Sequence, residues 1–295
     1  MNDFRFDLPY FDKMMPDLAA RKDPVLEALF GKNVHWGYWA DPGAATHTPE
    51  DFRQATDALT ARLLMQAQPA PGQRILDVGC GFGGTVALLN EHYTDLDMTG
   101  LNIDPRQIDR AIETVQPLAK RNNKIAFVVG DACALPFPDA CFDTMLAVEC
   151  IFHFRSRITF FNEVQRVLRP GGRLVLSDFI LHRWGRPLVS LIYMWCGEDV
   201  KRVYGTRTRF VPFSWYRVLA RQSGLIPGPV DDITRNTLPT YAVLRRWAKH
   251  CGFDPRSYVR AQAVCEYGSK LGAVSYAILS FNHTHPGASR RSSAK

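Results

Sequence analysis

The sequence predicts an α/β fold built on a doubly wound, mostly parallel sheet, and two observations support this prediction. The first is the stretch Arg74–Thr85, RILDVGCGFGGT, in which a short apolar run is followed by a glycine-rich turn and the beginning of a helix. The second is the alternation of short apolar runs with helical patterns along residues 69–180. Helical segments between successive strands are typical of the crossover connections of a parallel sheet.

The length of 295 residues is enough for one substantial core, or for one domain with an inserted cap. No apolar run reaches the ~18 residues that a transmembrane helix needs, and Met1–Asp12 lacks the pattern of a signal peptide. The seven cysteines include no C-x-x-C pair and are typical of small core residues in a reducing cytosol. We therefore expect a cytoplasmic protein without a transmembrane segment.

The net charge of +7 comes with many arginines between Lys201 and Arg260. A solvated basic face accounts for this charge, and an anionic substrate or peripheral contact with an acidic membrane surface is compatible with it. The sequence contains no helix-turn-helix, zinc or RNA-binding pattern, so nucleic acid is not an expected partner. The expected partner is a small-molecule acceptor, and the sequence makes no prediction of the oligomeric state.

Before residue 69 the sequence predicts helices with an aromatic segment between them. Tyr10–Phe30 reads as one or two short helices, and Asp51–Gln68 has apolar residues at helical spacing. Between them lie the aromatic segment Asn33–Trp39, NVHWGYW, and the loop Ala40–Pro49. Residues 1–68 are therefore predicted to be an N-terminal helical segment.

After the glycine-rich turn, strands and helices alternate. Further strands are predicted at Met98–Ile103, Ile125–Val129, Thr144–Val148 and Arg173–Asp178. Helices are predicted at Gly84–Glu91, Pro105–Lys120 and Ile158–Val167, and a turn at Arg169-Pro170-Gly171-Gly172 ends the last of them. The final predicted elements are a helix at Ser214–Ser223, an irregular strand at Gly228–Thr234 and a long strand at Ala273–Asn282.

Two stretches, Leu181–Pro212 and Pro239–Gly268, are rich in aromatic residues and interrupt this alternation. We expect them to form an aromatic helical cap at the carboxyl ends of the strands, where open α/β sheets bind ligands. The predicted domain organisation is a core at 69–180, completed by 213–234 and 271–283, with a substrate cap at 181–212 and 235–270. The small, polar and basic residues 286–295 are predicted to be a disordered tail.

The glycine-rich turn carries a carboxylate at its beginning. Asp77 lies two residues before the first glycine of GCGFGG, a pattern that also satisfies the dinucleotide fingerprint G-x-G-x-x-G. A carboxylate at this strand end repels a pyrophosphate, whereas it accepts hydrogen bonds from an ammonium or hydroxyl group. The D-x-G-x-G-x-G arrangement resembles motif I of the class I S-adenosylmethionine-dependent methyltransferases, whose fold is a Rossmann-like seven-stranded sheet.

Four further stretches are similar to this family in the expected order. The second strand ends at Asn102, where most members have an acid that binds the ribose, and Gln107 follows in the next helix. The third strand ends at Asp131, and EVQRVLRPGGRL resembles the family's last helix, turn and fifth strand. NVHWGYW, the E-x-x-x-H segment that begins at Glu149 and the stretch VDDITRNTLPTY resemble the narrower tocopherol, sterol and macrolide-sugar methyltransferase group.

The resemblance implies that S-adenosyl-L-methionine is the cofactor and that residues 1–68 supply a lid over it. Asp77 would receive the methionine end, Asn102 and Gln107 the ribose, and Asp131 the adenine. The full set of implied cofactor-binding residues is Asp77, Gly79, Cys80, Gly81, Gly83, Asn102, Ile103, Gln107, Asp131, Ala132, Glu149 and Tyr38.

His153 is the predicted general base for a hydroxyl acceptor, because its ordinary pKa lies near neutrality. Asp178 is predicted to orient or charge-stabilise this imidazole, and Glu149 to face the methionine end or to stabilise a cation when the acceptor is a carbon atom. The implied substrate-binding residues are Trp36, Asp232, Arg235, Tyr241 and Tyr267. No metal site is expected, because the pair His283-x-His285 has no further ligand at suitable spacing.

The sequence thus predicts methyl transfer to oxygen or carbon of a largely apolar small molecule, of a natural-product or isoprenoid-like kind. An NAD(P)-dependent oxidoreductase is the alternative that the glycine pattern alone allows. Against it stand Asp77 and the amide at Asn102, since NAD typically meets an acid at the end of the second strand. A non-catalytic cofactor-binding protein of the same fold is the remaining alternative.

Overall fold

The computed structural model describes residues 9–20, 23–206 and 210–283, so the predicted tail at 286–295 and His285 lie outside the described residues. The chain divides into two compact units. One, the core unit, comprises residues 60–178, 213–231 and 278–295. The other, the helical unit, comprises residues 1–59, 179–212 and 232–277. Each is described by itself.

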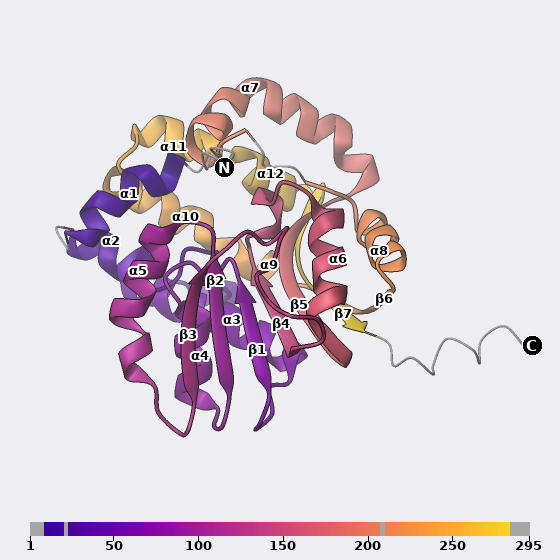
Figure 1. Ribbon diagram of the computed structural model, residues 1–295. Coiled ribbons are helices and arrows are strands. Elements are labelled where there is room, and N and C mark those ends of the chain that lie inside the picture. The colour runs from indigo at the N-terminus through magenta and orange to yellow at the C-terminus, as the bar shows by residue number, and fades with distance from the viewer. Residues whose placement is uncertain (1–8, 21–22, 207–209, 284–295) are drawn as a thin grey trace, which may run out of the picture. The chain divides into compact units, whose positions relative to one another are not determined.

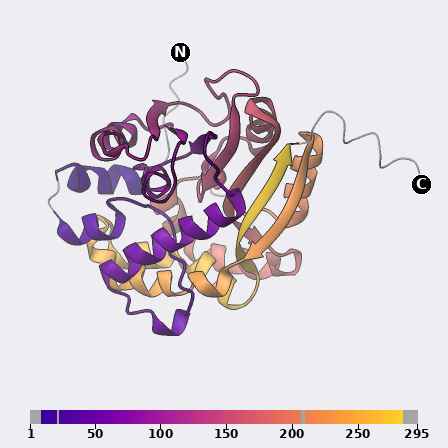
Figure 2. The ribbon, with the colours of Figure 1, turned by 90° about the horizontal axis from the view of Figure 1, so that it is seen from below.

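The described residues contain one seven-stranded sheet with the order β3-β2-β1-β4-β5-β7-β6 (Figure 1). Its strands are β1 Arg74–Val78, β2 Asp97–Asn102, β3 Lys124–Val129, β4 Phe142–Val148, β5 Leu168–Leu181, β6 Leu225–Asp232 and β7 Val274–His283. The pairs β1–β2, β2–β3, β1–β4 and β4–β5 are all parallel. β6 and β7 lie side by side at one edge of the sheet (Figure 2). The predicted doubly wound, mostly parallel sheet is confirmed.

β1 lies in the interior of the sheet between β2 and β4, which explains its apolar sequence. Ile75, Leu76 and Val78 are almost completely buried, as expected for a central parallel strand that is covered on both faces. From β1 the chain passes outward through β2 to β3, and it then returns to form β4 on the other side of β1. The strand order therefore reverses between β1 and β4, and open α/β sheets bind their ligands outside the carboxyl ends of strands at such a point.

The helices of the core unit are α4 Gly84–His92, α5 Pro105–Thr114, α6 Arg157–Val167 and α8 Phe213–Gln222. Local capping sets where they begin. The Asp104 side chain accepts from the Arg106 amide before α5, and the Ser156 side chain accepts from the Thr159 amide before α6. Helices α6 and α8 lie next to one another (Figure 1).

Two predicted boundaries in the core unit differ from the structure. α5 ends at Thr114 and a short 3-10 helix follows at Gln116–Leu118, where one helix to Lys120 was predicted. Pro117 explains this break, because proline has no amide hydrogen and disfavours a helical conformation in the residue before it. The predicted turn at 169–172 is instead the beginning of β5, and a register shift between Phe142 and Thr144 of β4 accommodates it.

The helical unit contains α1 Pro9–Ala19, α2 Pro24–Phe30, α7 Arg186–Tyr204, α9 Thr234–Thr237, α10 Pro239–Trp247, α11 Pro255–Ala261 and α12 Ala263–Lys270. It also contains the first part of α3 Pro49–Ala67. α7 packs against α1, α11 and α12. The inner face of α7, with Cys196 and Val200, forms a buried cluster with Ala263 and Val264. The described residues of the aromatic stretches 181–212 and 239–268 are therefore mostly helical, as predicted.

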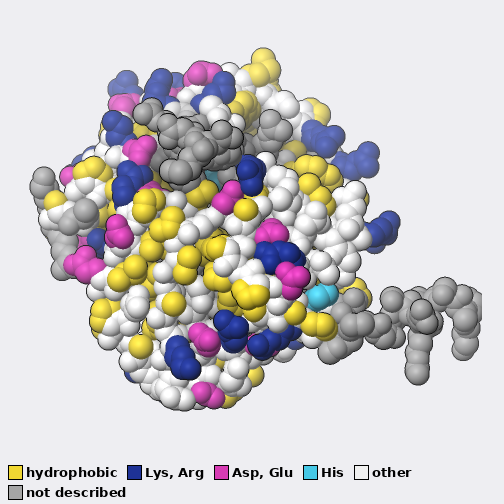
Figure 3. All heavy atoms as spheres, in the orientation of Figure 1, with side chains coloured by type: hydrophobic (Ala, Val, Ile, Leu, Met, Phe, Trp, Pro, Cys, Tyr) yellow, Lys and Arg dark blue, Asp and Glu magenta, His cyan; other side chains and the backbone are white. Residues whose placement is uncertain are grey.

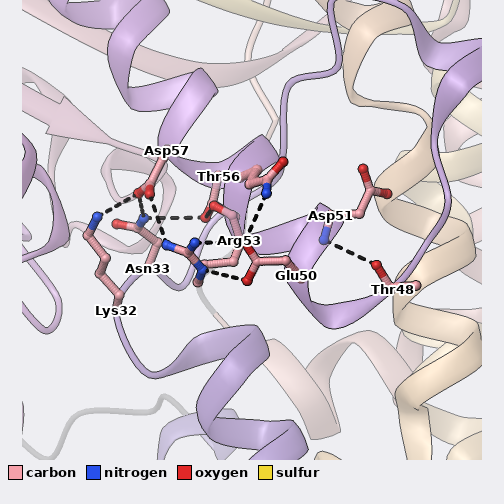
Figure 4. Close-up of polar contacts among 9 residues, drawn as sticks. Lys32, Asn33, Thr48, Glu50, Asp51, Arg53, Thr56 and Asp57 are labelled. Carbon is pink, nitrogen blue, oxygen red and sulfur yellow. Dashed lines mark hydrogen bonds and ion pairs between the residues drawn. The ribbon is translucent and has the colours of Figure 1, made fainter.

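The start of α3 fixes the beginning of the NVHWGYW segment through polar contacts (Figure 4). Asp57 accepts hydrogen bonds from Lys32 Nζ and Asn33 Nδ2, each at 2.9 Å. Arg53 Nη2 lies 2.7 Å from Glu50 Oε1, and Arg53 Nη1 lies 3.7 Å from Asp57 Oδ2. Asp57 thus links α3 to Asn33, the first residue of the aromatic segment, and to Lys32 directly before it.

Candidate functional site

The glycine-rich turn follows β1 and places three glycines in the left-handed region. Gly79, Gly81 and Gly83 have φ values of +73°, +55° and +84°. A Cβ atom on Gly79 would lie 2.7 Å from Cys150 Cβ, so only glycine fits there. At Gly81 the nearest atom to such a Cβ would be 3.9 Å away. The backbone at Gly81 is therefore open to close approach by a ligand.

Asp77 lies directly below this turn, at the carboxyl end of β1. Its side chain is about 1% exposed, and Oδ2 has no hydrogen-bond partner among the described residues. Burial raises the pKa of Asp77 to about 7, although a hydrogen bond with Thr85 lowers it in part. A buried acceptor without a donor is costly to the protein, and an ammonium group would supply the missing donor.

The ends of β2 and α5 bring Asn102 and Gln107 together. Asn102 Nδ2 donates a hydrogen bond to Gln107 Oε1 at 3.1 Å, and both side chains are buried. Asn102 Oδ1 accepts from the Asp104 amide at 3.1 Å. The pair offers neutral donors and acceptors, which fit the hydroxyls of a ribose. Ile103 follows in the turn between β2 and α5.

Asp131, just after β3, already has two partners in the core unit. Its Oδ1 accepts from the Cys133 amide at 2.7 Å, and Arg155 Nη2 lies 3.2 Å from its Oδ2. Ala132 is buried beside it. Arg155 belongs to no motif, so its pairing with Asp131 could not have been found from sequence spacing. The Arg155 guanidinium restricts how the Asp131 carboxylate can turn toward a ligand.

Glu149 directly follows β4 and has an unusual backbone conformation. Its φ of +50° lies in the left-handed region, which non-glycine residues seldom adopt, and its side chain is buried. The Glu149 amide donates to Ser177 Oγ at 3.0 Å, and Cys150 Sγ lies 3.1 Å from the Val78 carbonyl oxygen. These contacts hold the end of β4 against its neighbours at the point where the strand order reverses, and such strained residues are frequent at functional sites.

His153 lies in a short 3-10 helix, Ile151–His153, directly after this point. The residue is half-buried, and its ring centroid lies 4.4 Å from that of Phe152. Desolvation lowers the pKa of His153 to about 3, and the positive charge of Arg157 adds to this shift. The imidazole is therefore neutral at physiological pH, as a proton acceptor must be, but this pKa lies far below the near-neutral value on which the prediction rested, so His153 is a weaker base than expected.

Asp178 is fully buried at the place where the core unit ends on β5. Arg157 Nη2 lies 3.3 Å from Asp178 Oδ2, and the Tyr216 hydroxyl donates a hydrogen bond to the same oxygen. Burial is the largest effect on Tyr216, whose pKa it raises well above its usual value, and the Asp178 charge adds to it. The sequence offered no signal for Arg157, which begins α6, or for Tyr216, which comes from α8.

In the helical unit, aromatic contacts bring together two of the predicted substrate-binding residues. The Trp36 ring lies 5.4 Å from the Phe179 ring and 6.0 Å from the Tyr241 ring. The backbone of the NVHWGYW segment is fixed by bonds from Gly37 N to Thr240 Oγ1 and from Tyr38 N to the Ala55 carbonyl. The unit therefore contains an aromatic cluster anchored by main-chain hydrogen bonds.

The remaining predicted substrate residues lie elsewhere in the helical unit. Asp232 accepts from the Thr234 amide at 3.0 Å and from Ser275 Oγ at 2.9 Å, so its carboxylate is occupied by local contacts. Arg235 belongs to the short helix α9. Tyr267 on α12 is about half exposed. Within the described part of the chain, no cluster of three or more His, Cys, Asp or Glu side chains could hold a metal ion.

The core unit thus has three features at the carboxyl ends of β1 and β2. They are the glycine-rich turn, the buried Asp77 carboxylate with one oxygen that lacks a donor, and the neutral pair of Asn102 and Gln107. The described helices include none long and apolar enough to cross a membrane. This combination of fold and site defines a class I S-adenosylmethionine-dependent methyltransferase.

Comparison with known proteins supports the same class. The family model described as "Methyltransferase domain" matches residues 76–176. The 27-O-demethylrifamycin SV methyltransferase of Amycolatopsis mediterranei is 34% identical over 217 residues, which are 74% of this chain and 75% of the relative. The 2-methyl-6-phytyl-1,4-hydroquinone methyltransferase of Synechocystis is 31% identical over 231 residues, 75% of this chain and 68% of the relative.

Among solved structures, geranyl diphosphate C-methyltransferase from Streptomyces coelicolor has the same fold. Its TM-score is 0.68 at 17% identity, with 94% of this chain and 99% of that chain covered. The chain belongs to the class I S-adenosylmethionine-dependent methyltransferase family. It is an enzyme of that family, and S-adenosyl-L-methionine is its cofactor.

The residues of the core unit fit this cofactor. The Oδ2 atom of Asp77 has no hydrogen-bond donor among the described residues, and the ammonium group of the cofactor can provide one. The open backbone at Gly81 leaves room for a ligand. The bound cofactor supplies an electrophilic methyl group on a sulfonium.

Proposed function

We propose that this enzyme methylates an oxygen or carbon atom of a largely apolar small molecule. The observation that carries the proposal is the Asp77 carboxylate, which is buried at the end of β1 with one oxygen lacking a hydrogen-bond donor. A pyrophosphate would be repelled there, so an NAD(P)-dependent oxidoreductase is disfavoured. An amino-acid ammonium group satisfies the carboxylate, as methyl transfer from S-adenosylmethionine requires.

The class of acceptor follows from two lines of support. The relatives described above are named for a rifamycin and for a hydroquinone that carries a phytyl chain, both of them natural products. The helical unit of this chain contains the aromatic cluster of Trp36, Phe179 and Tyr241, and aromatic faces suit apolar or electron-rich ligands. We include Trp36, Tyr241 and Tyr267 in the substrate-binding set, with Asp232 and Arg235 as polar members.

We propose the following cofactor contacts. Asp77 holds the methionine ammonium, the backbone at Gly79, Cys80, Gly81 and Gly83 lies against the cofactor, and Asn102 with Gln107 binds the ribose hydroxyls. Ile103 packs at the ribose end, Asp131 and Ala132 contact the adenine, and Tyr38 closes over the cofactor. Glu149, held in a strained conformation by Ser177, faces the methionine end.

For a hydroxyl acceptor, we assign the general-base role to His153. Its neutral ring accepts the acceptor proton on a ring nitrogen, and the resulting imidazolium lies near the positive Arg157. Asp178 matters here because its carboxylate compensates the Arg157 charge. Asp178 therefore supports His153 through Arg157, while for a carbon acceptor Glu149 stabilises the developing positive charge.

The reaction is placed in the cytoplasm as part of this proposal. All seven cysteines lie within the described residues and none forms a disulfide, as expected in a reducing compartment.

Calorimetry and product analysis test the proposal. We expect S-adenosylhomocysteine to bind with a 1:1 stoichiometry and NADH not to bind, and we expect Asp77→Asn to abolish most of the binding heat. Incubation with methyl-labelled S-adenosylmethionine and a panel of phenolic, macrolide and prenylated acceptors should then yield a labelled product whose label is on oxygen or carbon. Binding of NADH alone would overturn the assignment. Binding of S-adenosylhomocysteine without transfer to any acceptor would favour a non-catalytic protein of the same fold.

A further inference from the structure

Helix α7 has an apolar stripe on its outer face that the fold does not use. Leu191, Met194 and Trp195 are 64%, 83% and 57% exposed, and they follow one another at helical spacing. Trp184, just before the helix, is 62% exposed. Because the buried cluster around Cys196 already holds the inner face of α7, the outer stripe makes no contribution to the core of the unit.

Two further exposed side chains lie on and just after α12, which packs against α7. Leu271 and Tyr267 are about half exposed. A Cβ atom on Gly272 would lie 3.6 Å from the Trp184 ring, so Gly272 lies close to that tryptophan. Leu271 directly precedes Gly272 in the sequence. We call Trp184, Leu191, Met194, Trp195, Tyr267 and Leu271 the α7 patch. Exposed patches with this many large apolar side chains mark interaction surfaces in soluble domains.

Basic side chains lie at the start of the α7 patch. Arg183 and Arg186 lie on either side of Trp184 in sequence and are exposed, and neither side chain has an ion pair or hydrogen bond within the described part of the chain. Arg260 lies over the Trp195 ring at 4.9 Å from its centroid and also pairs with Asp199. Hydrophobic and Lys or Arg side chains lie next to one another on this part of the surface (Figure 3).

The far end of α7 carries ion pairs, and there Arg202 and Arg260 share one acid, Asp199. Lys201 Nζ lies 2.7 Å from Glu198 Oε1, and Arg202 Nη1 lies 3.3 Å from Asp199 Oδ1. On α12, Lys270 Nζ is 2.6 Å from Glu266 Oε1. Positive charge therefore exceeds negative charge around the α7 patch, both at Arg183 and Arg186 and where Asp199 and Glu266 each pair with two basic side chains.

We propose that the α7 patch docks on the surface of a membrane that contains anionic lipids. Tryptophan, leucine and methionine side chains on one helix face enter the boundary between headgroups and acyl chains, and nearby arginines contact the anionic headgroups. A second copy of this chain fits less well, since a contact between two α7 patches would bring the excess positive charge of both copies together. The proposal stands without any assumption about methyl transfer.

Sedimentation of the full chain with vesicles tests this inference. We expect binding to vesicles of phosphatidylcholine mixed with phosphatidylserine and weak binding to phosphatidylcholine alone. The double variant Leu191→Ser/Met194→Ser should bind the mixed vesicles about tenfold more weakly, because two apolar side chains no longer enter the lipid. Met65→Ser is the matched control, because Met65 on α3 is 68% exposed and lies outside the patch.

Charge and oligomeric state are tested separately. Arg183→Glu/Arg186→Glu should abolish the preference for phosphatidylserine while leaving the thermal unfolding midpoint unchanged. Equal binding of the wild type and Leu191→Ser/Met194→Ser to mixed vesicles, or no binding by either, would overturn the inference. So would light scattering that shows a dimer of the wild type and a monomer of the same double variant, since a second copy would then cover the patch.

Discussion

The Tyr216 hydroxyl and the Arg157 guanidinium meet at one oxygen of the buried Asp178 carboxylate. Arg157 begins α6 and Tyr216 lies within α8, so the carboxylate joins the end of β5 to the two neighbouring helices. A buried ion pair of this kind contributes little net stability as a pair, but the loss of one partner leaves a buried charge without compensation.

We therefore expect Asp178→Ala to destabilise the protein by about 3–5 kcal/mol, as measured by urea denaturation. Tyr216→Phe removes one hydrogen bond and should cost about 1–3 kcal/mol. The double variant Arg157→Met/Asp178→Leu removes both charges and should recover most of the stability lost in Asp178→Ala. If the double variant were as unstable as Asp178→Ala, packing and not charge would account for the effect.

His153→Ala should lower turnover of a hydroxyl acceptor by about 10²-fold, the lower end of what a positioned general base contributes, because a pKa of about 3 makes His153 a weak base. The affinity for S-adenosylhomocysteine, measured by calorimetry, should stay within about twofold, since His153 is assigned to the acceptor proton and not to the cofactor. His92→Ala is the matched control, because His92 is exposed in the last turn of α4. Loss of cofactor affinity together with turnover would instead make His153 a structural residue.

The regular part of the fold could be predicted because each central strand is a short apolar run bounded by turn residues. The burial of Ile75, Leu76 and Val78 is what such a run requires between two neighbouring strands. The predicted helix runs beyond its true end at Thr114, because the helical pattern of the sequence continues past Pro117. The proline is the signal that the helix ends before it. Residues 169–172 were predicted to form a turn, whereas the structure includes them in β5. The sequence does not reveal this, because it depends on the shift in register with which β5 pairs with β4.

The candidate site could be predicted only where its residues are close in sequence. Asp77 adjoins the glycine turn, so its position in the sequence places it at the end of β1. Asn102 lies five residues before Gln107, so the sequence places this pair at the end of β2. Arg157 and Tyr216 are 59 positions apart, and only the packing of α6 against α8 brings them to Asp178. Arg155 was missed for a related reason, because its ion pair with Asp131 joins two loops.

Binding of S-adenosylhomocysteine should depend on pH through Asp77. Burial raises the pKa of this carboxyl to about 7, and the ligand ammonium binds the ionised form. Affinity should therefore fall as the pH drops below about 7, approaching tenfold per pH unit, and should level off above it. Asp77→Asn should bind weakly at every pH and without this slope. A wild-type affinity that is constant between about pH 5 and about pH 8 would contradict the assignment.

The same shift affects the stability of the ligand-free protein with a definite sign. Asp77 has a folded pKa above its unfolded value of 3.8, so the folded state disfavours the charged carboxylate. Below about pH 4 the group is protonated in both states and has no effect on stability. As the pH rises from about 4 to about 7 the free energy of unfolding should fall, and Asp77→Asn should remove this fall. Urea denaturation along the pH series measures both proteins.

Gly79→Ala and Gly72→Ala separate backbone strain from steric conflict. Both glycines are left-handed, with φ of +73° and +81°, so alanine costs about 1–2 kcal/mol at either position. A Cβ atom at Gly72 would meet nothing within 4 Å, whereas one at Gly79 would lie 2.7 Å from Cys150 Cβ. Gly79→Ala should therefore be less stable than Gly72→Ala by a further 1–3 kcal/mol or so, about the cost of overpacking. The second change Cys150→Gly removes the conflicting atom and should recover this difference, which urea denaturation of the four proteins will show. Equal stability of the two alanine variants would mean that the end of β4 yields to the added methyl group, and that the close approach of β1 and β4 at the cofactor turn is not tightly held.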